Sequence, residues 1–176
     1  MKAPVRTHLH RTLPLLGSLT TAEMEELSEI GQLVKAKPER VILHEGAPGN
    51  GLWLIVSGAV RCQLKGTNPT PIVLATLTPG SFFGEMSLLD DAPVSATIQT
   101  TEDTVFFYIP KAHFNQYRLQ LRPVAYKLLR AVGPTICERL RSIRARIEAI
   151  YERPEVLGEH LIDPALSYPQ TQRGIE

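Results

Sequence analysis

The segment PGSFFGEMSLLDDAPVSAT, residues 79–97, joins a short apolar run to a turn and a helical stretch. Phe82-Phe83 is typical of a strand end, and Gly84 allows a tight turn because glycine tolerates a positive φ. Glu85 then begins a predicted helical turn that runs through Leu89. Free N–H groups at the start of a helical turn can bind a phosphate, and a carboxylate accepts hydrogen bonds from ribose hydroxyls. The segment therefore has the parts of a sugar-phosphate pocket, although Glu85 can equally cap the turn.

Short apolar runs continue on both sides of this segment, and turns rich in Gly, Pro, Asn and Asp separate them. The runs are Val41–Leu43, Leu52–Val56, Ala59–Leu64, Ile72–Leu77, Phe82–Phe83, Ser95–Gln99 and Val105–Ile109. Many short strands with regular turns indicate a mainly β fold of the barrel or jelly-roll type. Trp53, within one of these runs, is interpreted as a core residue rather than a platform for stacking a base.

Helical patterns flank the predicted strands. Thr20 and Glu23 form a capping box, so a helix is expected to start there and to extend towards Pro38. Its apolar positions follow helical spacing: Met24, Leu27, Ile30 and Leu33. A short helix is expected after Pro110, because proline suits the first turn of a helix.

A long final helix is predicted from near Pro123 to about Glu152, with a kink or break at Gly133-Pro134. Its apolar residues recur at spacings of a heptad seam: Ile136, Leu140, Ile143, Ile147 and Ile150. This seam predicts a homodimer. The charged stretch from Glu138 to Arg146 is interpreted as the solvated flank of the seam, with contact to nucleic acid as the alternative.

These patterns divide the chain into four parts. Residues 1–12 and 153–176 are expected to be flexible tails, 13–121 a β-barrel domain with its short helices, and 122–152 a dimerisation helix. With 19 Lys+Arg against 18 Asp+Glu, the net charge of +1 argues against a dedicated nucleic-acid binder. Apolar runs fall short of the ~18 residues that cross a bilayer, so no membrane span and a cytoplasmic location are expected.

No enzymatic or metal-binding pattern emerges from the sequence. The five histidines are scattered and the cysteines number two, so no metal cluster and no metal cofactor are expected. Cys62 and Cys137 both lie in apolar patterns and are predicted to be buried free thiols. No nucleophile–base pair, Walker-type loop or paired acid/base signature is present, so the chain is not expected to be an enzyme.

Residues 79–97 resemble the phosphate-binding cassette of the cyclic-nucleotide-binding family, and residues 45–60 resemble its earlier glycine-bearing hairpin. The likeness covers about residues 13–150. This family includes the effector domains of catabolite-activator-type regulators, kinase regulatory subunits and gated channels. The resemblance implies a β-barrel or jelly roll with flanking helices and a long C-terminal helix.

The resemblance also implies a ligand, cAMP or cGMP, and the residues that bind it. They are Gly84, Glu85, Met86 and Ser87 around the ribose and phosphate, with Ser95 and Ala96 closing the pocket from the next strand. The family places an arginine for the cyclic phosphate immediately before that last pair, where this chain has Val94. Loss of a charged hydrogen bond of about 1.5–3 kcal/mol weakens binding roughly 10- to 150-fold. Arg61 or Arg139 are the candidates to supply the missing charge.

Two functions follow from this pattern. The first is a regulatory, non-enzymatic module that binds a cyclic nucleotide or another small anion and signals through a partner chain. The second is a degenerate barrel that no longer binds a nucleotide and serves dimerisation and protein contacts. Direct DNA binding through a winged helix-turn-helix is not expected, because only about 25 residues follow Ile150 and that module needs several packed helices.

Overall fold

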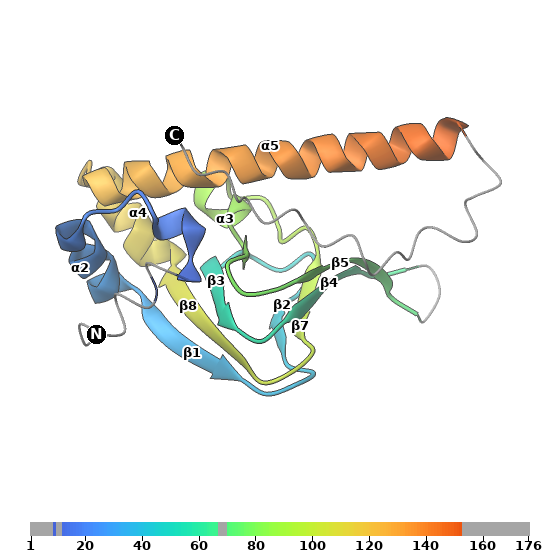
Figure 1. Ribbon diagram of the computed structural model, residues 1–176, viewed down its shortest axis with the longest axis horizontal. Coiled ribbons are helices and arrows are strands. Elements are labelled where there is room, and N and C mark those ends of the chain that lie inside the picture. Colours follow the sequence, from blue (N-terminus) through green and yellow to red (C-terminus); the bar gives the residue numbers. More distant parts are fainter. Residues whose placement is uncertain (1–8, 10–11, 67–69, 153–176) are drawn as a thin grey trace.

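Two four-stranded antiparallel sheets face each other in the computed structural model, and the long helix α5 crosses above them (Figure 1). The structure describes residues 9, 12–66 and 70–152, without the side chains of residues 146 and 149–152. One sheet has the strand order β1-β8-β3-β6 and the other β2-β7-β4-β5. The strands are β1 (Gln32–Ala36), β2 (Val41–Leu43), β3 (Gly51–Ser57), β4 (Val60–Leu64), β5 (Ile72–Leu77), β6 (Phe82–Phe83), β7 (Thr97–Thr100) and β8 (Thr104–Pro110). The helices are η1 (Pro14–Leu16), α2 (Thr21–Ile30), α3 (Met86–Leu89), α4 (Lys111–Leu119) and α5 (Pro123–Glu152).

The predicted mainly β fold with flanking helices and a long C-terminal helix is confirmed. The start of the first predicted helix is also confirmed, because Thr20 caps α2 and exchanges hydrogen bonds with Glu23 in a complete capping box. The predicted extent of that helix is wrong. It ends at Ile30, and β1 pairs with β8 from Gln32 onwards. Gly31 explains the change, because a Cβ there would lie 2.2 Å from the Phe107 ring, so the chain passes the core in extended form.

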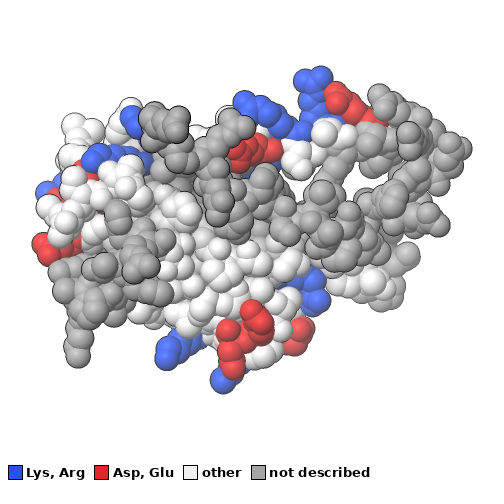
Figure 2. All heavy atoms as spheres, viewed as in Figure 1, with Lys and Arg blue, Asp and Glu red and all other residues white. Residues whose placement is uncertain are grey.

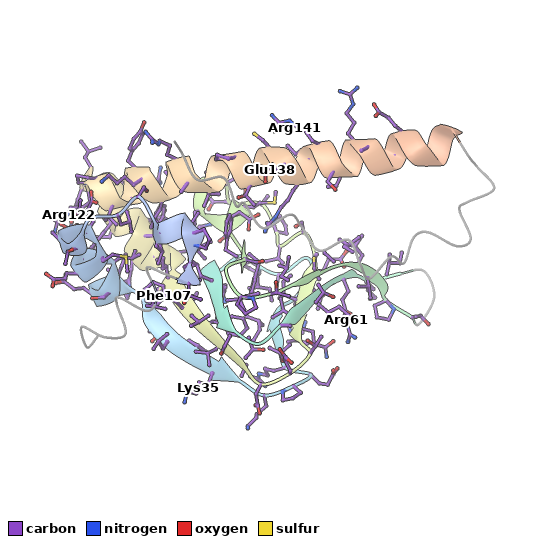
Figure 3. The ribbon with its side chains drawn as sticks, in the orientation of Figure 1. Lys35, Arg61, Phe107, Arg122, Glu138 and Arg141 are labelled. Atoms are coloured by element: carbon purple, nitrogen blue, oxygen red, sulfur yellow. The ribbon has the colours of Figure 1, made fainter. Side chains whose placement is uncertain are left out.

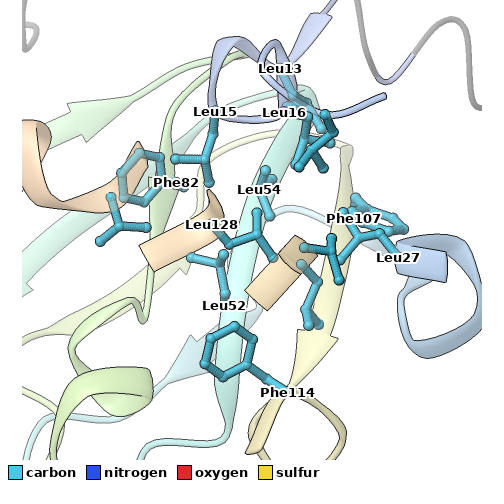
Figure 4. Close-up of a cluster of buried hydrophobic side chains, with 14 of the residues drawn as sticks. Leu13, Leu15, Leu16, Leu27, Leu52, Leu54, Phe82, Phe107, Phe114 and Leu128 are labelled. Carbon is cyan, nitrogen blue, oxygen red and sulfur yellow. The ribbon is translucent and has the colours of Figure 1, made fainter. Parts of the chain in front are cut away.

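The hydrophobic core has two parts, which lie on opposite sides of the β1-β8-β3-β6 sheet. The first lies between this sheet and the helices, and includes Leu52, Leu54, Phe107, Phe114 and Leu128 (Figure 4). The second lies between the two sheets, inside the barrel, and includes Trp53, Ile55, Phe83, Ile98 and Phe106. Successive residues of β3 point to opposite faces, so Leu52 and Trp53 enter different parts of the core. Trp53 is a core residue, as predicted.

Residues at the N-terminal end join the first part of the core. Leu9 is fully buried there together with Leu13 and Leu16, so the predicted tail of residues 1–12 does not include Leu9. The rest of that segment, apart from Thr12, and the predicted tail at 153–176 lie outside the described residues. Among the described residues, no helix is long and apolar enough to span a membrane.

Helix α5 runs unbroken from Pro123 to Glu152, with Pro134 inside it. Its first ten residues bury Val124, Leu128 and Val132 in the first part of the core. Lys127 adds an ion pair to Glu23 of α2, with 2.8 Å between Lys127 Nζ and Glu23 Oε2. The helix is therefore anchored firmly before Gly133.

Candidate ligand site

Gly84 shapes the turn between β6 and α3. Its φ is +77°, which only glycine adopts readily, and a Cβ there would lie 2.4 Å from the Gly51 carbonyl oxygen. Gly51 begins β3, so the turn is pressed against the strand that forms the centre of the first sheet. The chain can therefore direct residue 85 under α5 only with glycine at position 84.

Glu85 lies at the start of α3 and is 5% exposed. Its side chain makes no capping hydrogen bond to α3, so the capping interpretation is wrong. Instead, Arg139 Nη1 of α5 donates to Glu85 Oε1 at 2.5 Å. Arg139 Nη2 donates to the Phe82 carbonyl oxygen at 2.6 Å, and the guanidinium carbon lies 5.2 Å from the centre of the Phe82 ring. A charge-assisted hydrogen bond therefore joins the predicted ribose carboxylate to α5.

Ser87 and Met86 are neighbours in the short helix α3 but differ in exposure. Ser87 is buried, and its Oγ donates to the Gly84 carbonyl oxygen at 2.6 Å. Met86 is an exposed hydrophobic residue whose Sδ lies 4.0 Å from Ser95 Oγ. The N–H groups of Ser87 and Leu88 donate to the carbonyl oxygens of Gly84 and Glu85. These two amides are thus already used within the turn, whereas the phosphate interpretation calls on the backbone near Met86.

The strand side of the predicted pocket is formed by residues 94–96. Ala96 is buried and Ser95 is exposed. Val94 packs against the second part of the core, alongside Cys62. Two backbone hydrogen bonds of 2.8 Å fix it to the hairpin before β3, from Val94 N–H to Ala47 O and from Gly46 N–H to Val94 O. An apolar side chain therefore occupies the position where the resemblance calls for arginine.

The structure distinguishes between the two candidate cations. Arg61 hydrogen-bonds to Gln63 and Gln99 across β4 and β7 and lies on the sheet, well away from α5 (Figure 3). Of these two candidates, Arg139 is the one that contacts the cassette. The sequence pattern assigned the whole Glu138–Arg146 stretch to a solvated flank, and for Arg139 that assignment is wrong, since its side chain is 19% exposed. Arg141 does lie on the side of α5 turned away from the barrel (Figure 3).

The Cys62 thiol on β4 lies close enough to Arg139 and Glu85 for their charges to affect its pKa. Burial raises the pKa of the Cys62 thiol to about 11, while Arg139 lowers it and Glu85 raises it by smaller amounts. Cys62 is a half-buried free thiol and Cys137 an exposed one, so the prediction of two buried thiols is wrong for Cys137. Within the described ranges, no group of three or more His, Cys, Asp or Glu residues could bind a metal ion.

The distal part of α5 presents the predicted seam to solvent. Leu140, Ile143 and Ile147 are exposed, and Ile136 packs against the first part of the core. The side chain of Ile150 lies outside the described residues. Both basic and acidic side chains lie along the outer edge of this helix (Figure 2), and Arg144 pairs with Glu148 one turn later. Opposite charges so close together give this edge no strong net charge.

The fold is thus a jelly-roll barrel with a helical turn beneath a long C-terminal helix. The family model described as "Cyclic nucleotide-binding domain" matches residues 33–120, half of the chain. The chain therefore belongs to the cyclic nucleotide-binding domain family.

Individual relatives agree with this assignment. The chain is 35% identical over 112 residues to a cAMP-dependent protein kinase regulatory subunit of Hypocrea atroviridis, covering 64% of this chain and 22% of that protein. It is 31% identical over 137 residues to Glutaminase 1 of Bradyrhizobium diazoefficiens, covering 78% of this chain and 22% of that protein. The catabolite activator protein of Thermus thermophilus superposes with a TM-score of 0.66 at 27% identity, over 78% of this chain and 63% of that one. The chain thus spans roughly a fifth to a quarter of the length of the first curated relatives.

Proposed function

We propose that the chain is a regulatory, non-enzymatic module that binds a ribose-bearing ligand and signals through a partner chain in the cytoplasm. The ligand would contact Gly84, Glu85, Met86 and Ser87 from the cassette, and Ser95 and Ala96 from the strand side. The observation that supports this proposal best is the contact between Arg139 of α5 and Glu85. Family membership supports the same site, since cAMP and cGMP are the ligands that the family name implies.

The Arg139–Glu85 pair connects ligand binding to the position of α5. A ribose hydroxyl that donates to Glu85 Oε1 would take the place that Arg139 Nη1 occupies. A ligand shifts a conformational equilibrium by its difference in affinity for the two states. A ligand that bonds to Glu85 favours the state in which Arg139 is released. Release of Arg139 would free the part of α5 beyond it to move.

The position of Gly133-Pro134 suits a hinge for this motion. Proline has no N–H group to donate to the carbonyl of the preceding turn, and glycine has a low helix propensity. This dipeptide lies between the anchor at Lys127 and the contact at Arg139. A Cβ at Gly133 would meet no atom within 4 Å, so packing does not explain the glycine.

The exposed seam of α5 supports a homodimer. Leu140, Ile143 and Ile147 follow spacings of three and four, so they share one helix face, and all are at least half exposed. Ile136 would continue the seam towards the barrel and Ile150 away from it. A second copy that pairs along this face would cover the exposed apolar area and carry a movement of α5 to the other subunit.

The second candidate function is a degenerate barrel that serves protein contacts without a ligand. Val94 favours it, because the apolar side chain leaves a cyclic phosphate without its expected partner. This candidate needs only the fold and the exposed face of α5.

A binding and exchange experiment separates the two functions. The native protein would be titrated by calorimetry with cAMP, cGMP, adenosine and guanosine, with Glu85→Gln as the matched control. Binding by any member of this panel, its loss in Glu85→Gln, and faster hydrogen exchange in residues 135–147 upon binding are expected for the sensor. Absence of binding by all four compounds would contradict the sensor for these ligands and favour the degenerate barrel.

A further inference from the structure

The charges around the candidate site cancel each other. Glu85 contributes one negative charge and Arg139 one positive charge, and the two groups contact each other directly. Both lie close enough to Cys62, on the inner wall of the barrel, to affect its thiol. If a ligand displaces Arg139 from Glu85, the carboxylate remains next to the ligand. An anionic group on that ligand would then lie near a negative charge.

Basic side chains elsewhere near the cassette are directed to other partners. Lys111 Nζ bonds to Asp91 Oδ1 at 2.7 Å and to the Asp90 carbonyl oxygen at 3.3 Å, at the far end of the cassette. Arg61 bonds to Gln63 and Gln99. Neither side chain is therefore directed towards Val94 in the part of the chain that the structure describes.

Val94 makes the anion-binding position apolar. Its side chain packs with the second part of the core, and its backbone is fixed on both sides by hydrogen bonds. Burial of an anion without a charged partner is strongly unfavourable. A hydroxyl group needs only the acceptor that Glu85 provides.

We infer that the site prefers an uncharged ribose-bearing ligand, a nucleoside, to the corresponding nucleoside cyclic phosphate. The inference rests on the proposed function, because it assumes that Glu85 binds the sugar. It adds the chemical class of the ligand: the ribose hydroxyls are recognised at Glu85, and a neutral group faces Val94. The charge of the ligand is thus selected by the side chain at position 94.

The test compares nucleosides with their cyclic phosphates on three proteins. Native protein, Val94→Arg and the uncharged control Val94→Met are each titrated by calorimetry with adenosine, guanosine, cAMP and cGMP. For the native protein, the better nucleoside is expected to bind at least ~10-fold more tightly than its cyclic phosphate. Val94→Arg is expected to raise the affinity for cyclic phosphates roughly 10- to 150-fold, with nucleoside affinity changed less than ~3-fold. Val94→Met should still bind the nucleosides more tightly than their cyclic phosphates, as the native protein is expected to do.

The outcomes separate this inference from the proposed function. Native protein that binds cAMP or cGMP as tightly as the nucleosides overturns the inference and leaves the proposed function standing. Absence of binding by all four compounds to the native protein overturns both. If Val94→Arg does not fold, as judged by its circular dichroism spectrum, the ratio of nucleoside to cyclic-phosphate affinity in the native protein still tests the inference. A second check is salt, because native nucleoside binding forms no ion pair with the ligand and should not weaken between roughly 50 and 500 mM, whereas binding of cyclic phosphates to Val94→Arg should weaken.

Discussion

The two halves of α5 contain similar apolar residues but place them in different surroundings. Before Gly133, Leu128 is 1% exposed in the core beneath the helix. After Gly133, Leu140 is 61% exposed on the same helix. The difference arises because η1, α2 and α4 pack against the first half, whereas most of the second half stands clear of the strands below it (Figure 1). One half of the helix therefore belongs to the folded domain, and the other half is available to a ligand-controlled contact and to a partner.

The largest expected effect concerns assembly through the distal half. Leu140→Asp or Ile147→Asp places a charge in the proposed seam and should convert a dimer fully into monomers, as measured by light scattering at micromolar concentration. Ala145→Asp, on the opposite side of the same helix, is the matched control and should remain dimeric. A native protein that is already monomeric under these conditions contradicts the dimer.

The next effect concerns the stability that the half of α5 before Gly133, the proximal half, gives to the fold. Leu128→Ala removes a buried side chain and should lower the free energy of unfolding by about 3 kcal/mol. Leu140→Ala, in the distal half, should change it by less than about 0.5 kcal/mol. Both are measured by urea denaturation in the monomeric Ile147→Asp background, so that dimerisation does not contribute. Equal losses at the two positions would mean that the distal half is packed like the proximal one.

A smaller loss is expected from the contact between the distal half of α5 and Glu85. Arg139→Met leaves the buried Glu85 carboxylate without this cation and should destabilise the fold by about 2 kcal/mol. This is below the value for a fully buried pair, because Arg139 is 19% exposed on its side chain. Arg141→Met on the outer side of the helix is the control and should change stability by less than about 0.5 kcal/mol in the same urea titration. A similar small change in both variants would show that the Arg139–Glu85 pair contributes little.

The smallest effect concerns Gly133, where the first and second halves of α5 meet. Gly133→Ala should stabilise the protein by roughly 1 kcal/mol, because alanine has the higher helix propensity and its Cβ meets no atom. Gly84→Ala should instead destabilise, since its Cβ would strike the Gly51 carbonyl. Thermal denaturation measures both. A destabilised Gly133→Ala would mean that the helix needs flexibility at this position even without a ligand.

The sequence predicted those features that depend on neighbouring residues. The capping box at Thr20, the short strands between glycines and the helical spacing of α5 are all local patterns, and each one appears in the fold. Residues 79–97 also indicated the tight turn at Gly84, whose positive φ the structure shows.

What the sequence could not predict depends on distant contacts. Arg139 lies 54 residues from Glu85 in the chain, and the sequence could name it as a candidate cation beside Arg61 but could not show that it contacts Glu85. Its burial depends on where α5 crosses the cassette, and only the tertiary fold determines that. The strand β1 was missed for a related reason, because Gly31 faces the Phe107 ring and ends a helix that local spacing would extend. Helical periodicity alone does not report such a steric limit.

The length of α5 beyond Gly133 has a mechanical consequence. At 1.5 Å per residue, Arg139 lies about 9 Å from Gly133 along the helix axis and Glu152 about 28 Å from it. A rigid rotation of ~10° about Gly133 would therefore move Arg139 by about 1.6 Å and the end of the helix by about 5 Å. The end of the helix lies about three times as far from Gly133 as Arg139 does, so it moves about three times as far. A shift no larger than the breaking of one hydrogen bond at Glu85 becomes, at the far end of α5, a movement as large as one helical turn.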